Sequence, residues 1–214
     1  MAPRPTVLSL CAGAGGLDLG LRLACGARTV AYVERDGYAA AVLVARMEDA
    51  SLEQAPIWDD LATFDGEPWR GVVDIVAAGF PCQPHSVAGK RAGLADERWV
   101  WPDIARVVRE VGPGLVFLEN VPGLLTSGGL GACLGDLAAL GYDSEWGVFS
   151  AAEVGAPHRR ERVFILGHAV RGRSGRADTE PESLVARMAG NARRTSADVG
   201  HANDARRGEH GGAV

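Results

Sequence analysis

The chain has 214 residues, of which 47% are apolar and 23% are charged, so its composition excludes a mainly disordered protein and allows one domain with a sizeable core. No apolar run approaches the length of a transmembrane helix, and the first ten residues lack the features of a signal peptide. We therefore expect a cytoplasmic protein with free thiols and no membrane partner. The net charge of −5 is uneven, with −9 over residues 1–155 and +4 over residues 156–214. Such an acidic body is not typical of a dedicated nucleic-acid binder, although a local arginine cluster can still meet phosphate.

Strand patterns and helical patterns alternate between residues 6 and 169. A short apolar strand at 6–10 leads into a glycine loop, and the leucine-rich segment 17–24 then fits both a strand and a helix. We predict a helix, because a strand, a glycine loop and a helix form the commoner sequence of elements. Further strands are predicted at 29–34, 72–80, 114–119, 145–150 and 162–169, with helices at 38–47, 104–111 and 130–137 and a candidate short strand just before residue 60.

This alternation predicts an α/β fold. Strands separated by helices form parallel β–α–β units, and strands without strict polar alternation fit a sheet that is covered on both faces. We therefore expect a doubly wound, mostly parallel sheet with helices on both faces.

The alternation ends near residue 170. Beyond this point the sequence is mainly Arg, Gly, Ala, Asp and His, with one short apolar cluster around Leu184. So little apolar surface does not offset the entropy lost on ordering. We therefore predict a folded domain at 1–169 and a tail at 170–214, which is either largely disordered or the start of a region that the chain does not complete.

The first group of candidate functional residues is the glycine loop at 12–16, which follows the first strand. Ligands of open parallel sheets bind at the carboxyl ends of strands, and glycine lets a ligand approach the backbone. Glu34 ends the next strand, where a carboxylate can hold ribose hydroxyls. The pattern G-x-G-x-x-G fails at Asp18, which favours an adenosyl ligand other than NAD, and a purely structural turn is the alternative. Asp60, after the short strand, either contacts an adenine amino group or caps a helix.

A second group lies where two later strands end. Cys82 stands in a proline-flanked loop, unlike the other three cysteines, which fit buried positions. A thiol is intrinsically nucleophilic. Glu119 ends the following strand, so two adjacent parallel strands would bring the thiol and the carboxyl group to one edge. This pair suits covalent attack with proton donation, whereas a helix cap or a solvated acid is the alternative for Glu119.

Two arginines precede the last strand. Arg160 and Arg162 point to the same side if the strand has begun, and there they can pair with phosphate, with a base carbonyl or with Glu119. A solvated charged turn is the alternative.

Taken in order, six segments resemble motifs of the cytosine-5 DNA methyltransferases over roughly residues 6–168. The PCQ loop followed by ENV is highly specific in combination, and the glycine loop is less so. The resemblance implies a Rossmann-like methyltransferase that uses S-adenosylmethionine, flips cytosine out of double-stranded DNA and methylates its carbon 5 through a covalent cysteine adduct. It also implies a bacterial or phage-encoded protein, for which restriction–modification, phage self-protection and regulation are all open. The segments are LCAGAGGLDLGL, YVERD, PIWDDL, GFPCQPHSVAGKRAG, FLENVPGLL and GAPHRRERVFILG.

The resemblance also implies roles for individual residues. Cys82 is the expected nucleophile at carbon 6, and Glu119 the expected donor of a hydrogen bond or proton at ring nitrogen 3. Arg162 is expected to hold the base carbonyl and Glu119, with Arg160 near a phosphate. The expected cofactor-binding residues are Gly13, Gly15, Gly16, Glu34, Asp60 and Phe80. The expected substrate-binding residues are Gln83, Ser86 and Lys90, on or near a loop that closes over DNA, and Asn120, which braces the Cys82 loop; no metal site is expected.

The chain also departs from the family pattern. Cys11, His85 and His158 stand where an aromatic residue, a Phe and a Gln are usual, but none of these changes removes a bond-making group. The larger departure is that residues 170–214 contain no target-recognition region and no final motifs. We therefore expect an active methyltransferase, the catalytic half of a split enzyme that needs a complementing chain, or an inactive truncated remnant. A tRNA cytosine methyltransferase is a less favoured reading.

Overall fold

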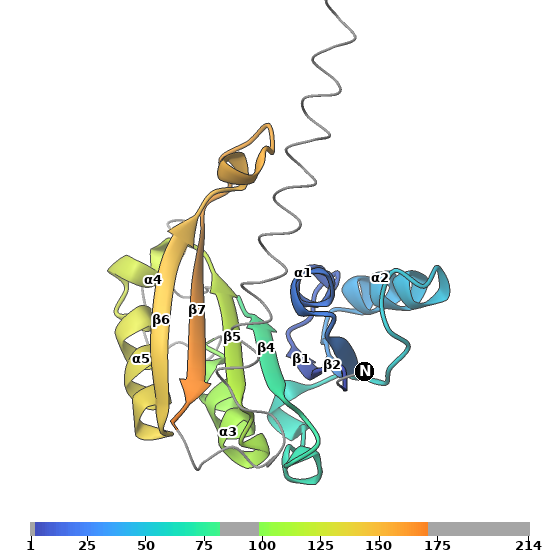
Figure 1. Cartoon of the computed structure of the whole chain (residues 1–214), viewed down its shortest axis with the longest axis horizontal. Helices are drawn as coiled ribbons and strands as arrows, with labels where there is room; N and C mark the ends of the chain where they lie inside the picture. The colour runs from blue at the N-terminus through green and yellow to red at the C-terminus, as the bar shows by residue number, and fades with distance from the viewer. Residues whose placement is uncertain (1–2, 82–98, 171–214) are drawn as a thin grey trace, which may run out of the picture.

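The computed structural model describes residues 3–81 and 99–170. These two ranges form a seven-stranded sheet in the order β3-β2-β1-β4-β5-β7-β6 (Figure 1). The strands from β3 to β5 in this order are parallel, and β7 runs antiparallel to both β5 and β6. The prediction of a mostly parallel sheet is therefore confirmed. The strands are β1 (Thr6–Leu10), β2 (Arg28–Val33), β3 (Ile57–Trp58), β4 (Ile75–Gly79), β5 (Leu115–Asn120), β6 (Tyr142–Phe149) and β7 (Arg162–Ala169).

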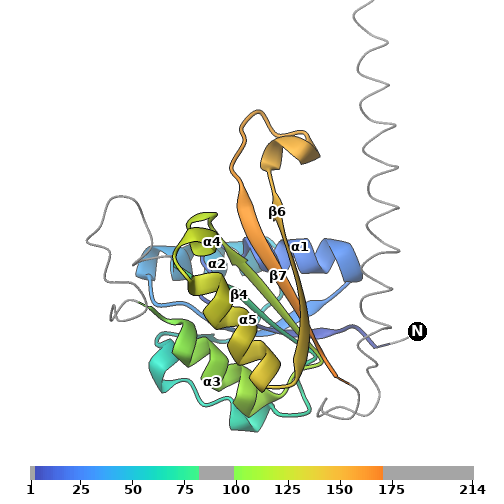
Figure 2. The same ribbon diagram turned by 90° about the vertical axis from the view of Figure 1, so that its left-hand side faces the viewer.

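The described helices lie on both sides of this sheet. Helices α3, α4 and α5 cover one side, and α1 lies on the other (Figures 1 and 2). Within the described ranges, three short 3-10 turns, η1, η2 and η4, lie in the connections. None of the described helices has the length and apolar character that crossing a membrane requires. The elements are α1 (Gly16–Cys25), α2 (Gly37–Glu48), α3 (Trp101–Val111), α4 (Gly123–Thr126), α5 (Gly129–Ala139), η1 (Leu61–Thr63), η2 (Glu67–Trp69) and η4 (Ala151–Val154).

Most of the predicted elements are confirmed, including a helix rather than a strand after the glycine loop. The apolar side chains of α3 at positions i, i+3, i+4 and i+7 all pack into the largest core cluster. The main differences are at boundaries, since β4 begins at Ile75 and β6 begins at Tyr142. The tail from residue 171 onward and the segment 82–98 lie outside the described residues, so the predicted boundary at 169 and the predicted tail stay predictions.

The two faces of β5, β7 and β6 are covered to different extents. On one face, Val116 and Ile165 pack with α3 and α5 in the largest core cluster. On the other face, α1 packs through Leu21 over β1, β4 and the start of β5, and Phe117 and Leu166 lie at the margin of that cluster. Beyond this margin no described helix covers β7 and β6 (Figures 1 and 2). Helices on both faces are therefore seen for the centre of the sheet, but not for its β6 edge within the described ranges.

Gly15 allows the tight turn between β1 and α1. Its φ of +73° lies in the left-handed region, and a Cβ added there would lie 2.3 Å from Cδ1 of Leu52. A side chain at this position is therefore strained by both its backbone conformation and its surroundings.

We predict that Gly15→Ala lowers the free energy of unfolding by about 1–3 kcal/mol, measured by urea denaturation. The matched control is Gly20→Ala on the exposed side of α1, where an added Cβ meets nothing within 4 Å. That control is expected to raise stability by roughly 0.5–1 kcal/mol through helix propensity. Equal stability of the two variants would contradict the packing role of Gly15.

Candidate active site

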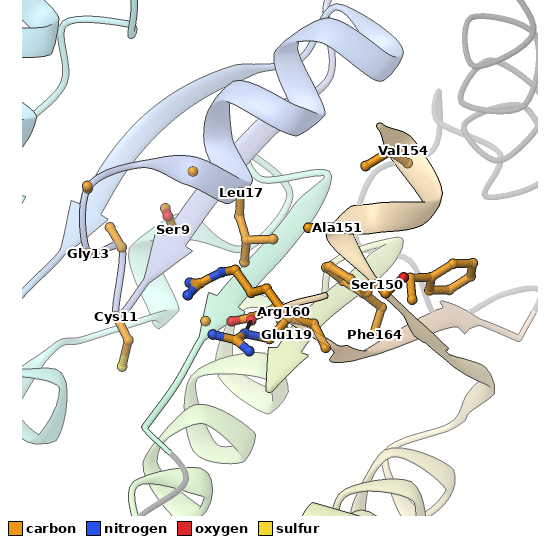
Figure 3. Close-up of a pocket in the computed structure, with 16 residues that line it drawn as sticks. Ser9, Cys11, Gly13, Leu17, Glu119, Ser150, Ala151, Val154, Arg160 and Phe164 are labelled. Atoms are coloured by element: carbon orange, nitrogen blue, oxygen red, sulfur yellow. Dashed lines mark ion pairs between the residues drawn. The ribbon is translucent and has the colours of Figure 1, made fainter. Parts of the chain in front are cut away.

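A cavity of about 680 Å³ opens at the carboxyl ends of β1 and β4 (Figure 3). The glycine loop and the start of α1 form one wall of the cavity, and the connection between β6 and β7 forms the opposite wall. Glu119 lies between them, at the end of β5. This position matches the general rule that open parallel sheets bind ligands beyond the carboxyl ends of their strands. The lining residues are Ser9, Cys11, Ala12, Gly13, Ala14, Gly16, Leu17, Gly79, Glu119, Phe149, Ser150, Ala151, Val154, Arg160, Arg162 and Phe164.

The glycine loop is tied to the end of β2 by Glu34. The Gly13 amide donates to Oε2 of Glu34 at 2.6 Å, and the Asp36 amide donates to Oε1 at 2.7 Å. The Ala12 amide donates to the Val33 carbonyl at 3.1 Å. The structure thus brings together the loop and the acid that the sequence placed about 20 residues apart. Glu34 lies beside the loop and is not among the residues that line the cavity.

The backbone of the loop is open to a ligand at two of its glycines. A Cβ added at Gly13 or at Gly16 would meet nothing within 4 Å, and both residues line the cavity. Gly15 differs, since it is buried against Leu52 and Leu43 and does not line the cavity. Gly13 and Gly16 therefore leave their backbone open to a ligand, whereas Gly15 shapes the turn.

Two predicted cofactor-binding residues lie in other surroundings. Asp60 does not line the cavity, and its Oδ1 accepts a hydrogen bond from the Ala62 amide at 3.0 Å, which makes it the N-cap of η1. Phe80 is 3% exposed, and its ring packs against Trp99 and Trp101 with centroids 5.9 Å apart in each pair. Phe80 is thus turned into the core because aromatic partners surround it there. The predicted contacts of both residues with a cofactor stay predictions.

Glu119 and Arg162 form an ion pair in the wall of the cavity. Nε of Arg162 lies 2.6 Å from Oε1 of Glu119, and the two side chains are 22% and 24% exposed. Arg162 also donates to the Glu161 carbonyl at 2.8 Å. In the sheet Glu119 pairs with Gly79 of β4, where an added Cβ would lie 3.4 Å from Oε2 of Glu119. The missing side chain at Gly79 therefore leaves space beside the second carboxylate oxygen.

Arg160 reaches the same cavity by a different route from the predicted one. The strand begins only at Arg162, so strand alternation does not orient Arg160. Its φ of +38° instead turns the backbone just before β7. Both arginines line the cavity, and Figure 3 shows Arg160 there.

Asn120 joins the ends of β4 and β5. It is 2% exposed, and its Nδ2 donates to the Phe80 carbonyl at 3.1 Å. It therefore holds the backbone two residues before Cys82, where the sequence predicted a brace. Cys82 itself and the other predicted residues of that loop, Gln83, Ser86 and Lys90, lie outside the described residues.

The three described cysteines are poor nucleophiles. Cys25 and Cys133 are buried. Burial, followed by the charges of Glu34 and Asp103, raises the pKa of the Cys11 thiol to about 12. Cys11 lines the cavity, but at neutral pH it is almost entirely in the unreactive thiol form.

Sequence reasoning missed the wall formed by the connection between β6 and β7. Phe149 and Ser150 line the cavity there, and Ser150 and Glu153 form a capping box at the start of η4. The spacing S-x-x-E is a known signal for such a turn and was the available clue. Sequence reasoning also missed Ser9, which lines the cavity from β1.

The fold and the cavity define a Rossmann-like α/β protein with a cavity between β1 and β4, where the strand order reverses. Among solved structures, the Dnmt2 methyltransferase of S. pombe has a TM-score of 0.62 at 24% identity, covering 78% of this chain and 51% of that one. The model of the C-5 cytosine-specific DNA methylases matches residues 5–187, and the chain belongs to this family.

The curated relatives are type II methyltransferases that are longer than this chain. M.PspPI of Psychrobacter sp. (strain TA137) is 38% identical over 76% of this chain and 39% of its own length. M.NgoMIV of Neisseria gonorrhoeae is 37% identical over 75% of this chain and 51% of its own length. M.HhaI of Haemophilus parahaemolyticus is 35% identical over 74% of this chain and 47% of its own length. The chain therefore spans between about two fifths and half of these relatives.

We predict that Cys11 resists alkylation in the folded protein. At pH 8 a thiol with a pKa of about 12 holds on the order of 10³-fold less thiolate than a free cysteine, so its reaction with iodoacetamide is expected to slow by about that factor. Peptide mass spectrometry over time measures the rate, and the same thiol in 8 M urea serves as the control. Equal rates in the folded and unfolded protein would show that Cys11 is not protected.

Proposed function

We propose that this chain is the catalytic part of a DNA (cytosine-5-)-methyltransferase. The observation that carries the proposal is the ion pair of Glu119 and Arg162, which lies across a cavity from an open glycine loop. An adenosyl cofactor on the loop and a base against the ion pair would share this one cavity. The family membership and the PCQ sequence that follows β4 support the same reaction.

The described residues fit S-adenosylmethionine. Gly13 and Gly16 leave space at the backbone that a side chain would fill, and the carboxylate of Glu34 stands next to Gly13, where ribose hydroxyls find an acceptor. Gly15 would keep the loop in its turn, Asp60 would contact an adenine amino group, and Phe80 would lie close to the adenine or sulfonium end of the cofactor. When bound, the cofactor supplies an electrophilic methyl group on a sulfonium.

Cys82 would begin the reaction as a nucleophile, and no described cysteine competes with it. Its thiol loses a proton to solvent, and the thiolate forms a bond to carbon 6 of a flipped-out cytosine. The electron pair of the ring double bond would move to carbon 5, which would take the methyl group as the methyl–sulfur bond breaks and its electron pair stays on the sulfur of the departing neutral thioether. The carbon 5 proton leaves to water, and the returning electron pair expels the Cys82 thiolate and restores the ring.

Glu119 would make cytosine electrophilic enough for this attack. A protonated Glu119 would donate a hydrogen bond or its proton to ring nitrogen 3, which withdraws the negative charge that builds up in the ring, and it would take the proton back when the ring is restored. Arg162 holds Oε1 of Glu119, so Oε2 beside Gly79 is the oxygen left to face the base. Arg162 would also contact the base carbonyl, and Arg160 a nearby phosphate.

The remaining substrate-binding roles fall to the loop after β4 and to its brace. We assign Gln83, Ser86 and Lys90 to contacts with double-stranded DNA. Asn120 acts indirectly, since it fixes the Phe80 carbonyl and with it the start of that loop. As a DNA-modifying enzyme the chain would work in the cytoplasm of a bacterial or phage-infected cell, and the names of its relatives favour a role in type II modification.

We further propose that sequence recognition comes from polypeptide beyond this chain, such as a complementing chain. The relatives have about twice the matched length, and the net charge of −5 gives the chain little attraction of its own for DNA. The face of the sheet beyond Phe117 and Leu166, which no described helix covers, offers such polypeptide the exposed ring of Phe149 and the partly exposed ring of Phe164.

We predict that the chain forms a covalent adduct with duplex DNA that contains 5-fluorocytosine, in the presence of S-adenosylmethionine. Fluorine at carbon 5 does not leave as a proton does, so the sulfur–carbon bond persists and is seen by denaturing gel electrophoresis and mass spectrometry. The experiment is run with and without the recognition region of a relative, and with fluorinated tRNA beside DNA.

The control is Cys82→Ala, which is expected to bind S-adenosylmethionine like the wild type and to give no adduct. Adduct only with the added region supports a split enzyme, and adduct on tRNA alone would redirect the proposal to RNA. No adduct under any condition would identify an inactive remnant and overturn the proposed activity.

We predict that Glu119→Gln slows methyl transfer by about 10²–10³-fold, because an amide is a weaker proton donor at the ring nitrogen. Single-turnover transfer of tritiated methyl groups measures the rate, and cofactor affinity is expected to stay within twofold. The control is Glu145→Gln, an exposed acid on β6, which should leave the rate unchanged. A wild-type rate in Glu119→Gln would refute the role assigned to Glu119.

A further inference from the structure

The first turn of α1 contains a buried carboxylate that the proposed reaction does not use. Asp18 is 3% exposed. Its Oδ2 accepts a hydrogen bond from the Ser9 hydroxyl at 2.9 Å, and its Oδ1 accepts one from the Thr29 hydroxyl at 2.8 Å. Within the described ranges no salt bridge includes Asp18. A buried carboxylate that lacks a cation is retained at a cost in stability, which calls for a reason.

These hydrogen bonds close the glycine loop from the inside. Ser9 precedes the loop and Asp18 follows it, so their hydrogen bond joins the end of β1 to the first turn of α1. Gly15, the N-cap of α1, provides no side-chain cap. On the outer side, Glu34 accepts from the Gly13 amide. Two carboxylates therefore hold the loop: Asp18 through the Ser9 hydroxyl, and Glu34 through the Gly13 amide.

The pairing of β1 with β2 places Thr29 within reach of Asp18. Val7 of β1 pairs with Thr29 of β2, and directly paired strand residues point to the same face of a sheet. Ser9 lies two residues after Val7 and therefore points to that face as well. Thr29 and Ser9 thus both present their hydroxyls to Asp18 of α1. Asp18 thus joins α1 to two strands at once.

Stability alone does not account for a carboxylate at this position. Burial raises the pKa of Asp18, although the hydrogen bonds with Thr29 and Ser9 act in the opposite direction. An acid whose folded-state pKa is raised favours folding only while it is protonated, and this contribution is lost as the pH rises through that pKa. The charged form of the side chain therefore lowers the free energy of unfolding. What the carboxylate provides instead is two acceptor oxygens on α1, one bonded to the Ser9 hydroxyl of β1 and the other to the Thr29 hydroxyl of β2.

We propose that Asp18 is a positioning residue that holds the glycine loop in its cofactor-binding shape. It acts through Ser9, which lines the cavity, and through the start of α1, and it touches no substrate itself. The identity of the cofactor rests on the proposed function. A loop already in its bound shape loses less conformational entropy on binding, so loss of the tie is expected to weaken cofactor binding.

Asp74 provides a matched control at the opposite end of β1. It is also 3% exposed, and its Oδ2 accepts from the Thr6 amide at 2.8 Å and from the Thr6 hydroxyl at 2.9 Å. Asp74 therefore ties β1 to β4 at their amino ends, far along the strand from the glycine loop. The two aspartates share burial and type of partner but differ in their position relative to the cavity.

The test compares Asp18→Asn and Asp74→Asn by two measurements. Isothermal titration calorimetry gives the Kd for S-adenosylmethionine, and hydrogen exchange with mass spectrometry gives the protection of the amides of residues 12–17 without any ligand. For Asp18→Asn we expect at least a tenfold higher Kd and at least tenfold faster exchange in the loop. For Asp74→Asn we expect both values within twofold of the wild type.

Thr29→Val and Thr29→Ser keep the test decisive if Asp18→Asn fails to fold. Valine removes the hydroxyl and should reproduce the faster exchange, whereas serine retains it and should not. Unchanged exchange in both Asp18→Asn and Thr29→Val, or an equal effect of Asp74→Asn, would overturn the inference. If the wild type binds no S-adenosylmethionine, the proposed function fails, and the exchange data alone then decide whether Asp18 holds the loop.

Discussion

The site depends on the parallel pairing of β4 with β5. This pairing places Gly79 opposite Glu119 at the edge where β1 also ends, so the acid, the glycine loop and the start of the PCQ loop meet at one cavity. Asn120 ties the same two strands through the Phe80 carbonyl. A slip of one residue would turn Glu119 to the opposite face of the sheet, among the helices of the core. The register of two short strands is therefore a functional constraint as well as a structural one.

Carboxylates around the cavity are held by different partners, and these partners explain their different roles. Backbone amides hold Glu34, hydroxyls hold Asp18, and the Arg162 guanidinium holds Glu119. The first two are fixed on both oxygens and shape the glycine loop. Glu119 has one oxygen held and one beside the open space at Gly79, so it is the acid best placed to act on a substrate.

The chain spans only part of its relatives. On the face of β7 and β6 that no described helix covers, the ring of Phe164 packs against those of Phe117 and Phe149. Phe149 and Phe164 also line the cavity. Under the proposed function, polypeptide that covered these rings would also touch the wall of the site and would connect DNA recognition to catalysis.

The sequence by itself determined the order of elements, the edge at which the candidate site lies and the possible pairing of Glu119 with an arginine, because hydrophobic periodicity and motif order are local properties of the chain. For Asp60 it left a cap and an adenine contact open, and the structure shows the cap of η1. It could not show that Phe80 turns into the core between Trp99 and Trp101, because these packing partners lie beyond the loop that follows it. Nor could it show the tie of Asp18 to Ser9 and Thr29, since that depends on how two strands pair and where α1 packs on them. Local pattern thus set which residues are available at the edge, and tertiary packing decided which of them face the cavity.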